Sequence, residues 1–226
     1  MKKTLLLLLC ISAALFASAD VRVLSNVKLG EGYFPRFADA ETVTYLNAEN
    51  ASYITTPVDL NAALRVDNEN LELNLYRNGE KTVLKPHGDV NYIWSSLSPD
   101  QTMILFNTKF GTAVCDLNGK EIINVGNVNA PVWFGNNYIV GMNDLHDGYH
   151  FTSSNIVIAS VDGLERQELT DAVEMGYYPD VDAKSGRIVY ATDNGDIRLM
   201  QINLTEEPIR KDMPRLVQEL DGTLLN

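Results

Sequence analysis

A turn motif recurs along the chain at a nearly fixed interval, and it constrains the fold more than any other feature. Asn78-Gly79, Asn118-Gly119 and Asp162-Gly163 each stand between two short runs of strand-forming residues. The three glycines are 40 and 44 residues apart. Asn-Gly and Asp-Gly favour two-residue hairpins, because Gly adopts a positive φ without strain and Asn or Asp tolerates it. An interval of this length is typical of one four-stranded β-propeller blade per repeat.

A second marker recurs in phase with these turns. An entry segment containing aromatic residues or proline precedes a polar turn, and the turn leads into an apolar strand. No long stretch has the 3.6-residue apolar period of a buried helix, so the sequence predicts an all-β chain. The entry segments are residues 33–37, 92–97, 130–134 and 177–181, and the strands that follow are 42–46, 103–106, 138–140 and 187–190.

Ser98-Pro99-Asp100-Gln101, followed by the apolar run 103–106, is the clearest copy of this pattern. The order of entry strand, Ser-Pro-Asp-Gly-like turn, apolar strand and glycine hairpin resembles the TolB-like, WD40-like (PD40-type) β-propeller repeat family. The resemblance covers roughly residues 33–204, with Gln101 where the family usually has glycine. It implies a β-propeller and the binding of another envelope protein, although one propeller architecture serves many unrelated tasks.

The predicted fold is therefore all-β and β-propeller-like, with four blade modules at about residues 33–88, 89–129, 130–173 and 174–204. The first module is too long, and its extra sequence is either an inserted hairpin, with strands at 53–56 and 64–67, or a degenerate fifth blade. The fourth module lacks an outer strand, which the isolated run 21–24 is expected to supply, closing the last blade. TolB-like propellers usually have six blades, so the ring is either small or an open or partner-completed arc.

The first nineteen residues have the pattern of a cleaved signal peptide. Lys2 and Lys3 precede an apolar run at 5–16, and small residues follow at 17–19. The run is shorter than the ~20 residues of a bilayer-spanning helix. Cys10 follows Leu9 rather than a small residue, which disfavours a lipoprotein. The sequence thus predicts a periplasmic, extracellular or surface protein with a propeller domain at 20–205 and a tail at 206–226.

Charge and cysteine content exclude several classes of protein. The formal net charge of −12 disfavours nucleic acids and anionic membrane surfaces as partners. Cys115 is the one cysteine outside the leader, and its apolar neighbours predict a buried strand thiol rather than a nucleophile. The chain contains no Gly-x-Ser-x-Gly elbow, so a serine hydrolase triad is not expected. We expect a non-catalytic protein without a cofactor.

One polar loop is the candidate binding site. Asp144, His146, Asp147 and His150 lie close together in sequence, where they form a partner- or ligand-binding loop, a metal site, or only a polar turn. The calcium-loop pattern at 180–186 fails because the register puts Ser185 where glycine is needed. The recurring aromatic residues are expected to fill the core between blades, with a glycan-stacking platform as the alternative; they are Phe37, Trp94, Phe106, Trp133 and Tyr178.

Three functions follow from these features. The leading hypothesis is an exported scaffold that binds another envelope or surface protein through its face loops. The second is a propeller that binds a carbohydrate or small ligand. The third is a metal-dependent enzyme that uses the loop at 144–150.

Overall fold

The computed structural model describes residues 21–46, 59–171 and 173–204, and its regular elements are β-strands apart from one 3-10 turn, η1 (Glu69–Leu71). The predicted signal peptide, the expected strand at 53–56 and the tail at 206–226 lie outside the described residues. Within the described part, no helix is long and apolar enough to cross a membrane.

The second and third modules each form one four-stranded antiparallel sheet, as the repeat predicts. The second sheet contains β7 (Ile93–Leu97), β8 (Met103–Thr108), β9 (Gly111–Asp116) and β10 (Ile123–Gly126). The third contains β11 (Asn129–Phe134), β12 (Tyr138–His146), β13 (Phe151–Ser160) and β14 (Arg166–Glu168). In both sheets the chain order is also the spatial order, which is the up-and-down topology of a propeller blade.

The N-terminal strand completes the fourth module. β15 (Gly176–Asp182), β16 (Arg187–Thr192) and β17 (Asp196–Leu204) form a sheet whose outer strand is β1 (Val21–Glu31). β1 runs antiparallel to β17 along its whole length, from Val21 opposite Leu204 to Glu31 opposite Asp196. The expectation that the two ends of the chain share the last blade is confirmed.

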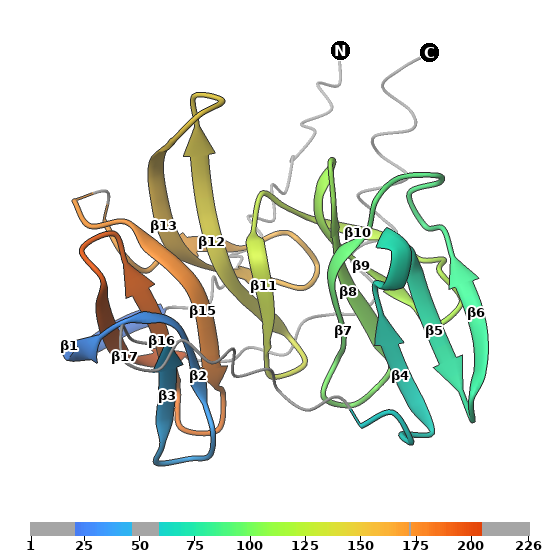
Figure 1. The fold of residues 1–226 in the computed structure, drawn as a ribbon, viewed down its shortest axis with the longest axis horizontal. Helices are drawn as coiled ribbons and strands as arrows, with labels where there is room; N and C mark the ends of the chain where they lie inside the picture. The colour runs from blue at the N-terminus through green and yellow to red at the C-terminus, as the bar shows by residue number, and fades with distance from the viewer. Residues whose placement is uncertain (1–20, 47–58, 172, 205–226) are drawn as a thin grey trace, which may run out of the picture.

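The first module is two sheets rather than one. β2 (Tyr33–Phe37) pairs with β3 (Val43–Leu46), whereas β4 (Leu64–Asp67), β5 (Leu73–Arg77) and β6 (Glu80–Leu84) form a separate sheet. β2 packs against β15 and β16, at one end of the molecule, and β4 packs against β7 at the other. The extra length of this module therefore belongs to a fifth, incomplete sheet among the described residues (Figure 1).

The sheets stack side by side, and both faces of each middle strand are buried. On β8, Ile104 and Phe106 pack toward the β4–β6 sheet, while Leu105 packs toward the third module. On β16, Ile188 faces the third module and Val189 faces β2 and β3. Burial on both faces explains why these strands are continuous apolar runs in the sequence instead of alternating ones. It also places the thiol of Cys115 in the core, where burial raises its pKa to about 12.

The three recurring glycines all lie in hairpin turns at positive φ, but the turns are of two kinds. Asn78 and Gly79 both have positive φ (50° and 86°) and form the predicted two-residue turn between β5 and β6. At Gly119 and Gly163 the glycine alone is left-handed, and the preceding Asn118 and Asp162 are not. The prediction of two-residue hairpins is wrong at these two sites. At Gly119 the Asp116 carboxylate accepts N–H bonds from Asn118 and Lys120, which holds a wider turn.

The first strand of four sheets carries a β-bulge at an equivalent position. The bulged residues are Phe34, Trp94, Ala130 and Tyr178, each left-handed with φ between 44° and 51°. Phe106 and Trp133 are buried as expected, but Trp94 is 40% exposed, so its assignment to the core is wrong. The equivalent bulged residues Ala130 and Tyr178 pack against the core, so the exposure of Trp94 is particular to its strand.

Candidate functional site

The β12–β13 hairpin extends beyond the other hairpins and carries the candidate loop at its end (Figure 1). β12 and β13 have 9 and 10 residues, whereas the corresponding β8 and β9 have 6 each. The two strands pair from Tyr138 opposite Ser160 to His146 opposite Phe151, with a register shift between Leu145 and His146. Because the ladder continues past the core, the last residues of each strand project into solvent on a hydrogen-bonded frame.

The turn at the tip is held by Asp147. Its Oδ1 accepts the backbone N–H groups of Tyr149 and His150, both at 2.8 Å, and its own N–H donates to the carbonyl of His150 at 3.1 Å. The N–H of Gly148 donates to Nδ1 of His146 at 3.2 Å. The backbone N–H groups, that of His150 first, lower the pKa of the Asp147 carboxyl, so the tip carries a negative charge at neutral pH.

Asp144 lies apart from the tip and has a structural partner. Its Oδ1 accepts Nδ2 of Asn129 at 2.6 Å, and Oδ1 of Asn129 accepts Nδ2 of Asn107 at 3.1 Å. Asn107 is buried on β8 and also donates to Oγ1 of Thr112. This chain of side chains joins the second sheet to the third. The structure thus gathers His146, Asp147 and His150 at the tip and uses Asp144 to fix the base of the hairpin.

No metal-ligand set is assembled at the tip or elsewhere in the described residues, where no group of three or more His, Cys, Asp or Glu side chains could hold an ion. At the tip, the lone pairs of Asp147 Oδ1 and His146 Nδ1 are directed at backbone N–H groups. These residues of the loop therefore present no coordination geometry on which a metal-dependent mechanism could rest.

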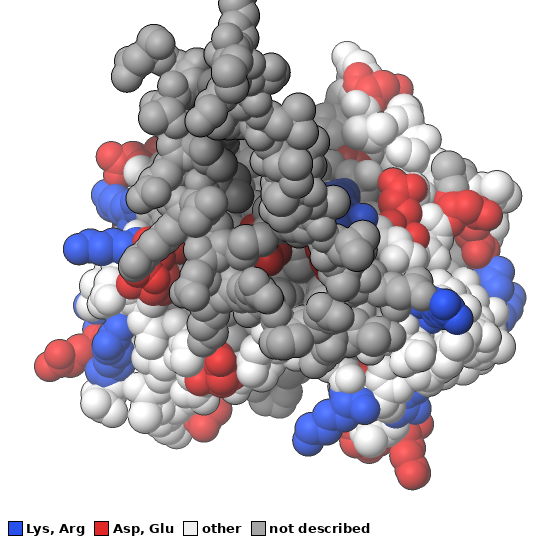
Figure 2. Space-filling model, turned by 180° about the vertical axis from the view of Figure 1, so that it is seen from behind, with Lys and Arg blue, Asp and Glu red and all other residues white. Residues whose placement is uncertain are grey.

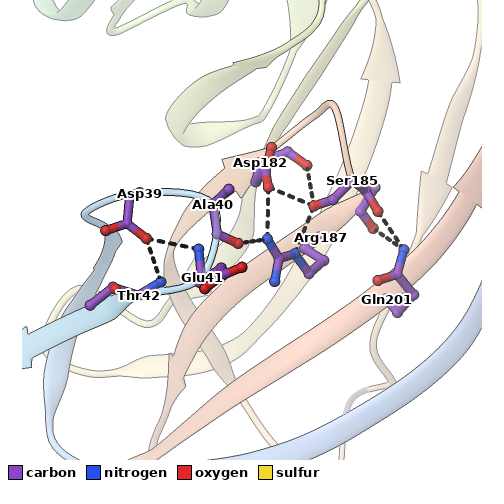
Figure 3. A network of polar contacts seen from close by, with 9 residues as sticks. Asp39, Ala40, Glu41, Thr42, Asp182, Ser185, Arg187 and Gln201 are labelled. Atoms are coloured by element: carbon purple, nitrogen blue, oxygen red, sulfur yellow. Dashed lines mark hydrogen bonds and ion pairs between the residues drawn. The ribbon is translucent and has the colours of Figure 1, made fainter.

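The aspartates at 180–186 are likewise engaged, as Figure 3 shows for Asp182. The Asp182 carboxylate accepts Oγ of Ser185 at 2.6 Å and pairs with the guanidinium of Arg187 at 2.9 Å. Arg187 also donates to the carbonyl of Ala40, in the turn between β2 and β3. Asp180 is half-buried and accepts the N–H of Phe37 at 2.8 Å. These contacts hold β2 and β3 against β15 and β16.

A hollow of about 490 Å³ lies under the hairpin tip. Aromatic rings and a thioether form much of its wall: the ring centroids of Phe151 and Tyr177 are 5.7 Å apart, and the Tyr177 hydroxyl donates to Sδ of Met175. Asp193 stands beside them, since its N–H donates to the carbonyl of Met175 at 3.2 Å. The lining residues are His146, Gly148, Tyr149, His150, Phe151, Met175, Tyr177 and Asp193. The hollow combines the predicted histidine loop with residues of the neighbouring fourth module.

Large apolar side chains are exposed at the end of the hairpin, and two of them, Tyr149 and Phe151, also line the hollow. Tyr149 is 91% exposed, Leu145 57% and Phe151 44%. Sequence reasoning selected the polar residues of the loop and missed these three, together with Met175, Tyr177 and Asp193. The pattern Leu145-x-x-x-Tyr149-x-Phe151 in a segment otherwise rich in polar residues was the available signal. Met175 and Asp193 carried none, because only the packing of β15 against β12 and β13 brings them to the loop.

The folded chain is thus an all-β protein of propeller-like class, with a projecting hairpin and a partly aromatic hollow. A scan against protein-family models finds no match, and no curated protein matches the sequence. Among solved structures, the crystal structure of the tricorn protease is similar at a TM-score of 0.44 and 15% sequence identity. That likeness covers 54% of this chain and 13% of the tricorn protease chain.

Proposed function

We propose that this chain is an exported, non-catalytic β-propeller that binds another protein of the bacterial envelope or cell surface through its β12–β13 hairpin. The observation that carries the proposal is the exposed hairpin end, where Leu145, Tyr149 and Phe151 present apolar surface at the end of the β12–β13 ladder. Tyr is enriched at protein–protein contacts because one end of the ring is apolar and the other is polar.

Two sequence features support the cellular setting of the proposal. The leader at 1–19 has the charge, apolar run and small-residue cleavage site of a signal peptide. The repeat pattern resembles the TolB-like family, and this resemblance implies a binding component of an envelope complex. A protein sent to the envelope with a propeller frame and an apolar projecting hairpin is suited to scaffolding.

Site-specific crosslinking in cells tests the proposal. A photoreactive phenylalanine analogue at Tyr149 is expected to give one discrete crosslinked adduct in the native host. The matched control carries the analogue at Leu60, which is also exposed and apolar but lies outside the hairpin. A Leu145→Ser, Phe151→Ser background should abolish the adduct at position 149. No adduct at Tyr149, or the same adduct from Leu60, would contradict the proposal.

A second candidate function, the binding of a carbohydrate or flat small ligand, is favoured by a different observation. Phe34 and Trp94 are 37% and 40% exposed at equivalent bulges, and the rings of Phe34 and Tyr178 lie 4.6 Å apart. Strained bulges that present aromatic rings occur next to ligand sites. Neither Phe34 nor Trp94 lines the hollow under the hairpin, so this function belongs to another surface. This second function is tested by titrating sugars into the parent protein and into Trp94→Phe and comparing their intrinsic tryptophan fluorescence.

A further inference from the structure

The third module lacks basic side chains over most of its length. No Lys or Arg lies between Lys120 and Arg166, a stretch that includes β11, β12, the hairpin tip and β13. The residues that line the hollow include Asp193 but no Lys or Arg. In Figure 2 the projecting part of the surface at the upper right, where the hairpin lies, shows acidic and no basic side chains. Among its lining residues, the hollow therefore has one carboxylate, two histidine rings and no Lys or Arg.

One carboxylate lines this hollow, and two others lie on the β12–β13 hairpin. Asp147 is ionised at the tip, because backbone N–H groups lower its pKa. Asp193 lies on the wall, with its carboxylate exposed. Burial raises the pKa of the Tyr177 hydroxyl, and the negative charges of Asp193 and Asp144 raise it further.

Aromatic rings beside a carboxylate favour a cation over an anion. A cation gains both from the negative faces of the rings and from the carboxylates. Tyr149, Phe151 and Tyr177 supply the rings, and the two rings of Phe151 and Tyr177 are tilted by 54°. A guanidinium suits such walls better than an ammonium, because it is planar, weakly hydrated and stacks on rings.

We propose that the hollow under the β12–β13 hairpin receives an Arg side chain of the partner protein. This inference rests on the proposed function, since the hairpin must first be a protein-binding site, and it assigns the chemistry of the contact. The guanidinium lies between Tyr149, Phe151 and Tyr177, and the Asp193 carboxylate neutralises its charge.

The direct test is a titration of the purified protein with N-acetyl-arginine methylamide, followed by nuclear magnetic resonance of the aromatic side chains. Binding in the millimolar range should shift the ring signals of Tyr149, Phe151 and Tyr177. The citrulline analogue, which has the same shape without the charge, should bind at least about fivefold more weakly. Raising the salt concentration should weaken the arginine complex more than the citrulline complex.

Two charge-matched variants locate the effect. Asp193→Asn should weaken arginine binding about three- to fivefold, as expected for the loss of an exposed ion pair. Asp89→Asn removes the same charge from the exposed loop between β6 and β7, and it should leave binding within error. Equal binding of arginine and citrulline, equal effects of the two variants, or no shift of the three rings would overturn the inference. Crosslinking at Tyr149 would be unaffected by that outcome, so failure here and failure of the proposed function are separable.

Discussion

At the scale of single residues, Gln101 occupies a backbone position that suits glycine. It lies in the Ser98–Asp100 turn with φ of 59°, and its N–H donates to the carbonyl of Ser98 at 2.8 Å. A left-handed conformation costs a non-glycine residue about 1 kcal/mol. Gln101→Gly should therefore raise the free energy of unfolding by up to about 1 kcal/mol, and Gln101→Val should lower it by about 1–3 kcal/mol. Urea denaturation of the pair gives the comparison, and a glycine variant no more stable than the valine variant would contradict this account.

The recurring glycines differ in the atoms that an added side chain would contact. This difference should rank the loss of stability on substitution. A Cβ at Gly79 meets nothing within 4 Å, whereas a Cβ at Gly163 lies 2.4 Å from the carbonyl oxygen of Asn124. Both residues have positive φ, so both substitutions carry backbone strain. Gly79→Val should cost about 1 kcal/mol of stability and Gly163→Val about 3 kcal/mol or more. Thermal unfolding of both variants tests the order, and equal losses would show that the contact with Asn124 relaxes.

At the scale of elements, two aspartates on or next to one hairpin should respond to pH with opposite signs. Burial raises the pKa of the Asp180 carboxyl on β15, whereas hydrogen bonds from Ser185 and Arg187 lower the pKa of Asp182. Ionised Asp180 therefore destabilises the fold at neutral pH, and this cost disappears as the pH falls below its unfolded pKa. Ionised Asp182 stabilises the fold at neutral pH, and this gain is lost as the pH falls through its lowered pKa.

The corresponding variants give the measurement. Asp180→Asn keeps an acceptor for the N–H of Phe37 and removes the charge, so it should be more stable than the parent at pH 7. Asp182→Asn should be less stable at pH 7, because it loses the charged contact with Arg187. Both differences should shrink toward pH 3, where the parent carboxyls are protonated in the unfolded chain. Differences of the same sign at pH 7 would refute the assignment.

The turn residues made the sheets predictable from the sequence. They did not predict where each strand ends or which way its side chains point. The spacing of Gly79, Gly119 and Gly163 located three hairpins correctly, since each needs positive φ. The length of the β12–β13 hairpin was not predictable, because the apolar run stops at Met142 while the ladder continues to His146. The exposure of Trp94 was not predictable either, since the equivalent bulged residue Tyr178 packs against the core.

The candidate site was predicted in part for a related reason. His146, Asp147 and His150 form a local turn, which sequence neighbours can specify. The floor of the hollow comes from β15 and from the turn after β16, which reach the hairpin only through packing of the third and fourth sheets. Contacts between blades are set by burial of apolar faces, and short motifs carry little information about them.

At the scale of the whole molecule, β1 and β17 bring the two ends of the described chain into one sheet. Val21 is buried against the third and fourth modules, and its carbonyl accepts Nε2 of Gln167 from β14. Further along β1, Nδ2 of Asn26 donates to the Tyr190 hydroxyl at 2.7 Å, and Lys28 pairs with Asp196 at 2.7 Å. β1 therefore contacts both of its neighbouring modules and covers β17, which would otherwise be the edge of the sheet.

Deleting residues 20–28 should consequently destabilise the protein far more than an ordinary terminal truncation. The deletion exposes one edge of β17, removes the buried side chain of Val21 and leaves the Tyr190 hydroxyl without Asn26. Together these losses amount to on the order of 3–5 kcal/mol. An unpaired β17 edge also favours association between molecules. Calorimetry and light scattering should show a lower melting temperature and a larger particle, whereas deletion of residues 206–226 serves as a control for loss of a terminus. A 20–28 deletion that stays monomeric and melts within a degree or two of the parent would mean that β1 contributes little to the last blade.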